Sequence, residues 1–326
     1  MKVIFSRIFI EKVNGGSIIQ DRTSLLVWIL SVLKWKQFGY GTIFYTDETT
    51  KNEFEKIGIL KLYDEVKIIK SDIDINEEIF WTCSKILSAK QFMEEYPNEE
   101  FMISDLDFIP LKDPFSFKTI DNEVLTFYQE YVPAYCPLKY LNLNNEYELP
   151  SFFTGKVDPI NACFLYIQKS NLSLFRKYLD IEIDFMNCHR DFISILNAND
   201  LMMFVEQRMF TEYLVSNDIP ITPISPRNKS VFNTSGIHTG PYKNLENTDY
   251  WKWNIWWLKL IKEEFPEVYD EVISLELYKD IKEIIDACKG NYYNKLKNET
   301  IITDFNWDTL EYPRAFEDIY NPKWNK

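Results

Sequence analysis

One stretch decides the expected fold: Phe101-Met102-Ile103-Ser104-Asp105-Leu106-Asp107-Phe108-Ile109-Pro110. Its apolar start predicts a short buried strand, which ends where two carboxylates follow two residues apart, with a proline soon after. In an open α/β sheet, ligands bind at the carboxyl ends of the strands. Because alternate residues of a strand share a face, Asp105 and Asp107 could meet one divalent cation such as Mg²⁺ or Mn²⁺. That cation would hold a pyrophosphate group.

A D-x-D triplet alone is weak evidence, and the chain contains its own comparison in Asp72-Ile73-Asp74. That triplet has polar residues on both sides and no buried strand before it, so we expect a solvated turn there. The alternative for Asp105 and Asp107 is a turn at the end of the strand with two exposed acids. The strand that precedes them favours the metal site.

The composition is that of a globular, acidic protein. The 326 residues, of which 46% are hydrophobic, can form one large α/β domain or a domain with an appendage. Only 9 glycines are present, so long flexible linkers are not expected. The net charge of −14 disfavours a nucleic-acid partner, because that binding depends on Lys and Arg at the phosphates. A metal ion would supply the positive charge that a phosphorylated ligand requires.

The cysteines and the apolar runs indicate the cellular location of the protein. The five cysteines are scattered and contain no C-x-x-C pair, which indicates reduced thiols, mostly buried, in a cytoplasmic protein. The N-terminus is typical of a strand and lacks the apolar core of a signal peptide. No apolar run approaches the length of about 20 residues that crosses a bilayer. We therefore expect a cytoplasmic protein without a transmembrane segment.

Hydrophobic periodicity predicts that strands and helices alternate over the first part of the chain. The 20–37 helix carries its apolar residues on one face, at Leu25, Leu26, Ile29, Val32 and Leu33. The β-α-β-α-β order predicts an α/β fold with a mixed, mostly parallel sheet flanked by helices. The expected strands cover 3–9, 42–46, 66–69, 101–103, 124–129, 159–167 and 219–224, and the expected helices cover 20–37, 51–57, 78–95, 172–178, 201–215 and 271–289.

Two pairs of residues on the expected helices are candidates for the site. Trp81 and Lys85 lie four residues apart and could share a face, from which Lys85 could reach a phosphate or a sugar. Glu206 and Gln207 lie among the apolar positions of the 201–215 helix and could face the cleft. The alternative for each charged residue is a solvated position on the surface, which is the common case.

A late loop supplies a third metal ligand. His238 lies between Gly236 and Gly240, where the backbone can approach a ligand closely. A neutral imidazole is a suitable ligand for a metal such as Mn²⁺ that carboxylates already hold. The other histidine, His189, lies in a polar stretch that indicates no ligand role.

The chain changes character near residue 246, so we expect a domain at 1–245 and a helical extension at 246–326. The extension carries an aromatic helix with Trp251, Trp253, Trp256 and Trp257. Trp-rich helices can lie at a membrane interface, so peripheral membrane contact is one interpretation. The acidic residues that follow would be repelled by anionic lipids, which favours packing against the main domain or a partner subunit.

Four pieces of the chain stand in a familiar order: the helix from Trp81 to Glu95, Ser104-Asp105-Leu106-Asp107, the strand that begins Asn161-Ala162, and Gly236-Ile237-His238-Thr239-Gly240-Pro241-Tyr242-Lys243. They resemble the nucleotide-sugar glycosyltransferases of GT-A fold, nearest the family-8, galactosyltransferase-like group. Three positions depart from that group: Cys163 stands where glycine is usual, the spacing from His238 to Lys243 is one residue shorter, and Glu206-Gln207 stands where Asp-Gln is commoner.

The resemblance implies a role for each matching residue. Asp105, Asp107 and His238 would bind Mn²⁺ or Mg²⁺, and Glu206 and Gln207 would be the catalytic residues. The implied donor-binding residues are Trp81, Lys85, Ser104, Asp105, Asn161 and Lys243, with Asn161 at the donor sugar and Lys243 at the diphosphate.

The implied activity is metal-dependent transfer of a sugar from a nucleoside-diphosphate donor, with UDP-sugar expected, to a glycan or another hydroxyl acceptor. Glu206 as a base would favour inversion, whereas the family-8 resemblance favours retention. A metal-dependent nucleotidyltransferase or phosphohydrolase is one alternative, although the chain has no G-x-x-x-x-G-K-[ST] loop. A non-catalytic sugar-binding protein is the other.

Overall fold

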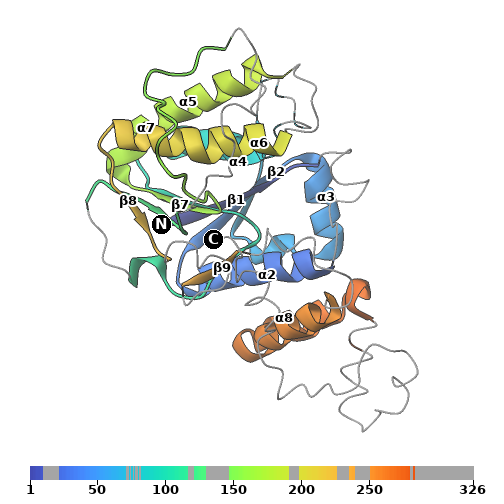
Figure 1. The fold of residues 1–326 in the computed structure, drawn as a ribbon. Helices are drawn as coiled ribbons and strands as arrows, with labels where there is room; N and C mark the ends of the chain where they lie inside the picture. Colours follow the sequence, from blue (N-terminus) through green and yellow to red (C-terminus); the bar gives the residue numbers. More distant parts are fainter. Residues whose placement is uncertain are drawn as a thin grey trace.

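The computed structural model describes residues 1–9, 22–70, 73, 75, 77, 80, 82–116, 121–129, 147–190, 198–225, 235–238, 250–279 and 282. Within them the chain forms a seven-stranded sheet with helices on both faces, and a separate two-stranded ribbon (Figure 1). The sheet contains β1 (Lys2–Arg7), β2 (Gly41–Thr46), β3 (Glu65–Ile68), β4 (Phe101–Ser104), β6 (Val124–Thr126), β7 (Phe164–Ile167) and β8 (Ile221–Pro223), and the ribbon contains β5 (Phe108–Pro110) and β9 (Gly236–His238).

The strand order of the sheet is β3-β2-β1-β4-β7-β6-β8. β1 pairs in parallel with β2 and β4, and β2 pairs in parallel with β3. β7 is antiparallel to both of its neighbours, and the edge strand β8 is parallel to β6. The predicted class, a mixed and mostly parallel sheet flanked by helices, is therefore confirmed. The strand order reverses between β1 and β4, and a crevice for a ligand is expected at the carboxyl ends of these two strands.

Helices form a layer on each face of the sheet (Figure 1). On one face α4 packs on β1, and α5 packs on α4 and on the π-helix η6. On the other face lies α2, with α8 outside it. β1 supports both layers, because Val3 and Phe5 belong to one hydrophobic cluster and Ile4 to the other. The helices are α2 (Arg22–Gln37), α3 (Glu48–Ile57), α4 (Cys83–Glu95), α5 (Leu172–Cys188), α6 (Ala198–Met203), η6 (Phe204–Met209), α7 (Phe210–Ser216), α8 (Tyr250–Glu264) and α9 (Pro266–Ile273).

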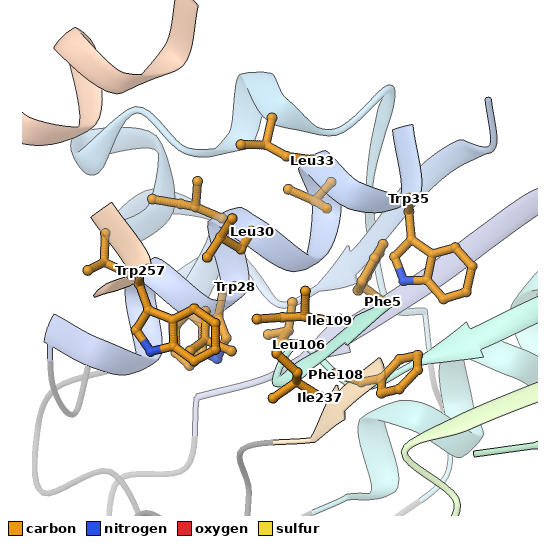
Figure 2. Close-up of a cluster of buried hydrophobic side chains, with 14 of the residues drawn as sticks. Phe5, Trp28, Leu30, Leu33, Trp35, Leu106, Phe108, Ile109, Ile237 and Trp257 are labelled. Atoms are coloured by element: carbon orange, nitrogen blue, oxygen red, sulfur yellow. The ribbon is translucent and has the colours of Figure 1, made fainter. Parts of the chain in front are cut away.

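Helix α2 is buried on nearly every side, whereas the sequence pattern predicts a single apolar face. Trp28, Leu30 and Trp35 are buried in addition to the residues of the expected face. The reason is α8, whose Trp257 and Leu258 join the same hydrophobic cluster (Figure 2). The predicted packing of the aromatic helix against the main domain is thus confirmed.

Two predicted helices differ in extent. The 78–95 helix begins only at Cys83, because a tight turn at Thr82 precedes it, with the Lys85 amide bonded to the Thr82 carbonyl at 2.9 Å. The expectation that Trp81 and Lys85 share a helical face falls on Trp81, which lies outside the described residues. Helix α5 continues well beyond the predicted 172–178 and ends at Cys188.

Two further predictions are corrected near the middle and the end of the chain. The strand expected from residue 159 begins only at Phe164, because the Asn161 side chain accepts a hydrogen bond from the Cys163 amide at 3.0 Å and turns the chain. The helix expected from residue 271 is interrupted near its start: α9 begins at Pro266 and ends at Ile273, and a 3₁₀ turn, Glu276–Tyr278, follows. Most of the expected range beyond residue 279 lies outside the described residues.

In the described part of the expected extension, helices α8 and α9 cover 250–264 and 266–273. The boundary between residues 245 and 246 stays a prediction. Among the described residues, no helix combines the length and the apolar character that crossing a bilayer requires. Cys83 and Cys163 are buried, whereas Cys188 is exposed.

Candidate functional site

Asp105 and Asp107 lie in a turn rather than along a strand. β4 ends at Ser104, and the Phe108 amide then donates to the Asp105 carbonyl at 3.2 Å. The expectation that strand geometry aligns the two carboxylates is therefore wrong, because the turn brings them together. Leu106 between them is buried in the cluster that contains α2. The side chains of Asp105 and Asp107 are 28% and 14% exposed, so they are not the two exposed acids of the alternative.

The β5–β9 ribbon brings His238 to these aspartates. β5 follows directly on Asp107 and pairs antiparallel with β9, with Phe108 opposite His238. His238 Nε2 lies 3.6 Å from Asp107 Oδ1, and one ligand atom from each of Asp105, Asp107 and His238 lies within 4.8 Å of the other two. Carboxylate and imidazole donors suit a cation such as Mn²⁺. The three predicted ligands therefore form a group that fits a divalent cation.

Lys85 joins these ligands to the second predicted group. Its side chain is only 11% exposed, and its ammonium lies 2.6 Å from Asp105 Oδ1. It also donates to the Ala162 carbonyl at 3.1 Å and forms an ion pair with Glu206. Burial opposes its charge, but the carboxylates of Asp105 and Glu206 outweigh burial and raise the pKa of Lys85. Lys85 is therefore not the solvated surface residue of the alternative.

Glu206 and Gln207 lie in the π-helix η6, between α6 and α7. The sequence predicts one continuous helix at 201–215, because the wider turn leaves no mark in the apolar spacing. Tyr178 donates to one backbone carbonyl of η6, and Thr211 donates to the Gln207 carbonyl at 2.6 Å. π-Helical turns are rare and are frequent at functional sites.

Glu206 is a buried carboxylate with a shifted pKa. Its Oε1 pairs with Lys85, and its Oε2 lies 3.5 Å from the Thr82 hydroxyl. Burial raises the pKa of Glu206, Lys85 counteracts part of this rise, and the charge of Asp105 adds to it. Beside it, Gln207 is buried, and its Oε1 has no hydrogen-bond partner within the described ranges. A buried acceptor without a partner is costly, so this oxygen is a candidate partner for a ligand hydroxyl.

Asn161 and Ser104 are two predicted donor-binding residues. Their side chains form hydrogen bonds with other groups of the protein. The Asn161 amide donates to the Tyr128 hydroxyl at 3.0 Å. The Ser104 hydroxyl accepts from Trp35 Nε1 at 3.1 Å and donates to the Asp105 carbonyl at 3.1 Å. Both residues hold segments next to the predicted metal ligands, and their contact with a donor stays a prediction.

Glu182 is a buried acid near the site that the sequence analysis does not single out. It lies on α5 and is 3% exposed, and its Oε1 has no hydrogen-bond partner in the part of the chain that the structure describes. Burial and the charge of Glu206 raise the pKa of Glu182 well above its usual value. A signal existed in the sequence, because this glutamate stands next to Ile183 and three residues after Leu179, on the apolar period of the helix.

Some predicted residues lie outside the described residues, namely Trp81, Lys243, Asp72 and Asp74. His189, for which the sequence indicates no ligand role, is buried at the end of α5, and its Nδ1 lies 2.7 Å from the Phe185 carbonyl.

No protein-family model matches the sequence, and no curated protein matches it. Among solved structures, the PaToxG glycosyltransferase is similar over 67% of this chain and 78% of its own, at 12% identity and a TM-score of 0.33. Mouse xyloside xylosyltransferase 1, in its apo form, is similar over 69% and 86%, at 9% identity and a TM-score of 0.35. The glycosyltransferase GlyE of Streptococcus pneumoniae TIGR4 is similar over 82% and 64%, at 13% identity and a TM-score of 0.35. Because these identities and TM-scores are low, no residue role is transferred from these proteins.

Proposed function

We propose that this chain is a metal-dependent glycosyltransferase that moves a sugar from a nucleoside diphosphate to a hydroxyl acceptor. One observation carries the proposal: Asp105, Asp107 and His238 gather just beyond β4, and Lys85 links Asp105 to the buried Glu206. The carboxyl end of β4 is the edge at which an open α/β sheet binds ligands. A cation site next to a buried Lys–Glu pair suits a diphosphate that carries a sugar.

The proposed metal ligands are Asp105, Asp107 and His238, which would hold Mn²⁺ or Mg²⁺. When bound, the ion supplies positive charge that stabilises the departing diphosphate. The two carboxylates alone would repel that group, so the site depends on a cation. Lys243 is proposed as a further positive group at the diphosphate.

Lys85 and Glu206 are proposed to hold the donor sugar. The three N–H groups of Lys85 are taken by Asp105, Glu206 and the Ala162 carbonyl, so Lys85 fixes the position of the Glu206 carboxylate. Glu206 Oε2, whose contact with the Thr82 hydroxyl is long at 3.5 Å, is the proposed acceptor for a sugar hydroxyl. Gln207 adds the amide oxygen that has no partner among the described residues. Trp81, Ser104 and Asn161 stay proposed donor-binding residues.

In the transfer, the bond from the anomeric carbon to the phosphate oxygen breaks, and a bond to the acceptor oxygen forms. If Glu206 takes the acceptor proton, the expected outcome is inversion, and burial raises the pKa of Glu206 in the direction that a general base needs. If the departing phosphate takes that proton, Glu206 and Gln207 line the sugar instead, and the family-8 resemblance favours this retaining course. Both courses stay open.

The nucleotide, the biological context and the location are proposed from the sequence. UDP as the nucleotide, and glycan or surface polysaccharide synthesis as the context, follow from the resemblance to family 8. The cytoplasmic location follows from the scattered cysteines.

The test is incubation of the purified chain with a panel of UDP- and GDP-sugars and Mn²⁺. We expect slow donor hydrolysis that requires the metal, with free sugar and nucleoside diphosphate as products. Asp107→Ala should reduce this rate by at least about a hundredfold, because it removes a ligand of the ion that stabilises the leaving group. Asp180→Ala is the matched control, since the Asp180 side chain is 62% exposed on α5.

The products distinguish the alternatives. A phosphohydrolase would release sugar 1-phosphate and nucleoside monophosphate, because it cleaves between the phosphates. A sugar-binding protein would bind a donor without turnover. Either result, or hydrolysis that Asp107→Ala leaves unchanged, would contradict the proposal.

A further inference from the structure

We infer that Ser31, on helix α2, is a positioning residue for the metal site, an inference that rests on the proposed function. Ser31 is fully buried, and its hydroxyl donates to the Phe108 carbonyl at 2.6 Å. Phe108 directly follows Asp107 and lies opposite His238 in the ribbon. This hydrogen bond therefore acts on the residue that connects two of the three proposed ligands.

The ribbon that carries these ligands cannot hold its place alone. β5 and β9 have three residues each, and an isolated two-stranded ribbon is marginally stable at best. Its support comes from α2, because Leu106, Ile109 and Ile237 lie beside one another in the hydrophobic cluster to which α2 contributes (Figure 2). Apolar packing is non-directional, so it holds the ribbon against α2 without fixing its position along the helix. The hydrogen bond from Ser31 adds a directional contact between α2 and the ribbon.

Phe108 is also confined from the side of β9. A methyl group at Gly236 would lie 2.7 Å from the Phe108 ring and 3.2 Å from the Ile109 carbonyl, so only glycine fits against this ring. Phe108 thus has its carbonyl held by Ser31 and its ring held against Gly236. These two contacts fix Phe108, the first residue of β5, which directly follows Asp107.

The position of Phe108 matters because metal ligands tolerate little displacement. Ligand oxygens lie at about 2.0–2.6 Å from a bound divalent cation, so a shift of the ribbon moves Asp107 and His238 out of this range. Residues that orient metal ligands therefore change the affinity for the metal. Ser31 is placed to do this without contact with the ion.

The experiment measures the affinity of the full chain for Mn²⁺ alone, from the electron paramagnetic resonance signal of the free ion. We expect Ser31→Ala to weaken Mn²⁺ binding about two- to tenfold, the factor that the loss of one hydrogen bond between neutral groups gives. Thr42→Val is the matched control. The Thr42 hydroxyl is equally buried and hydrogen-bonded, at 3.2 Å from Asp64, but it lies at the amino end of β2, at the opposite edge of the sheet.

The control separates positioning from general stability. Weaker binding by Ser31→Ala, with Thr42→Val binding as the wild type does, supports the inference. Unchanged binding by Ser31→Ala overturns it while leaving the proposed metal site intact. Equal weakening by both variants overturns it too, because both would then act through stability. Absence of Mn²⁺ binding by the wild type overturns the inference and the proposed function together.

Discussion

Glu182 and Glu212 are both buried glutamates, yet their surroundings differ. The Glu212 carboxylate accepts hydrogen bonds from the amides of Thr154, Lys156 and Val157 and from the Thr154 hydroxyl, at 2.7–3.1 Å. Glu182 lies close enough to Glu206 for the two charges to interact, and its Oε1 has no partner in the described ranges. Glu212 therefore fastens a loop through four hydrogen bonds, whereas Glu182 is held in an environment that disfavours its charge.

Glu182 should make the protein less stable as the pH rises. Burial raises the pKa of Glu182 in the folded state above its value in the unfolded chain, so the native state binds the proton more tightly. This contribution is complete below about pH 4.3 and declines as the pH rises toward the folded pKa, by at most about 1.4 kcal/mol per pH unit. Glu182→Gln keeps the shape without the titration, so it should gain stability relative to the wild type between pH 5 and pH 8. Urea unfolding at each pH measures the difference.

Glu212→Gln is the control for this prediction. Its amide nitrogen cannot accept the hydrogen bonds that the carboxylate oxygen accepts, so this variant should be less stable than the wild type at neutral pH. If the stability of Glu182→Gln follows the wild type in parallel from pH 5 to pH 8, Glu182 does not titrate as its burial indicates.

At the scale of elements, an ionic network ties the end of α4 to the sheet. Lys67 of β3 lies 2.5 Å from Glu95 Oε2, Tyr45 donates to the same oxygen at 3.2 Å, and Lys2 and Lys67 both lie over the Tyr96 ring. Burial alone would raise the pKa of Glu95, but these hydrogen bonds, that from Lys67 first, lower it. The network therefore stabilises the fold when Glu95 is ionised.

Glu95→Gln should lower the stability at pH 7 by up to about 1 kcal/mol, the range of partly exposed ion pairs. A carboxyl with a lowered folded pKa contributes stability that is present above about pH 4.3 and lost as the pH falls through that folded pKa. The difference between variant and wild type should therefore shrink toward pH 3, as thermal unfolding can measure. Glu53→Gln is the control, because its partner Lys56 is 71% exposed and that pair should contribute almost nothing. A pH-independent difference would mean that packing, not charge, is lost.

The elements themselves follow from local sequence more closely than the site does. An apolar run between turn residues is a local signal, so the sequence predicts the central strands. Asp47 caps α3 by accepting a hydrogen bond from the Thr50 amide. The sequence does not predict the turn at Asp105 or the π-helix at Glu206. The hydrogen bond that closes the turn, and the extra residue in the π-helical turn, do not change the spacing of the hydrophobic residues. The ligand set was still found, since it depends on which residues meet at the sheet edge rather than on local geometry.

At the scale of the whole molecule, α2 is a central helix because α8 covers it. Lys34 of α2 pairs with Glu264 of α8, although the two residues are 230 positions apart in the chain. No pattern within α2 reveals such a partner. The sequence therefore predicts one apolar face for α2, whereas the structure buries nearly every face of this helix. The same helix supports the β5–β9 ribbon through Ser31. The extension therefore contributes to the layer on which the candidate metal ligands rest.

This arrangement predicts that the extension unfolds together with the sheet. Trp257 is 1% exposed and belongs to the cluster that includes Trp28 and Leu30, so Trp257→Ala should cost about 3–5 kcal/mol of unfolding free energy. Glu263→Ala on the same helix, whose side chain is 58% exposed, should cost less than about 1 kcal/mol. Urea unfolding followed by far-UV circular dichroism and by tryptophan fluorescence should show one coincident transition for each variant, because α2 loses its cover when α8 leaves. If Trp257→Ala instead produces an early transition and a second one at the wild-type midpoint, the extension is an independent unit, as a boundary at residue 245 would allow.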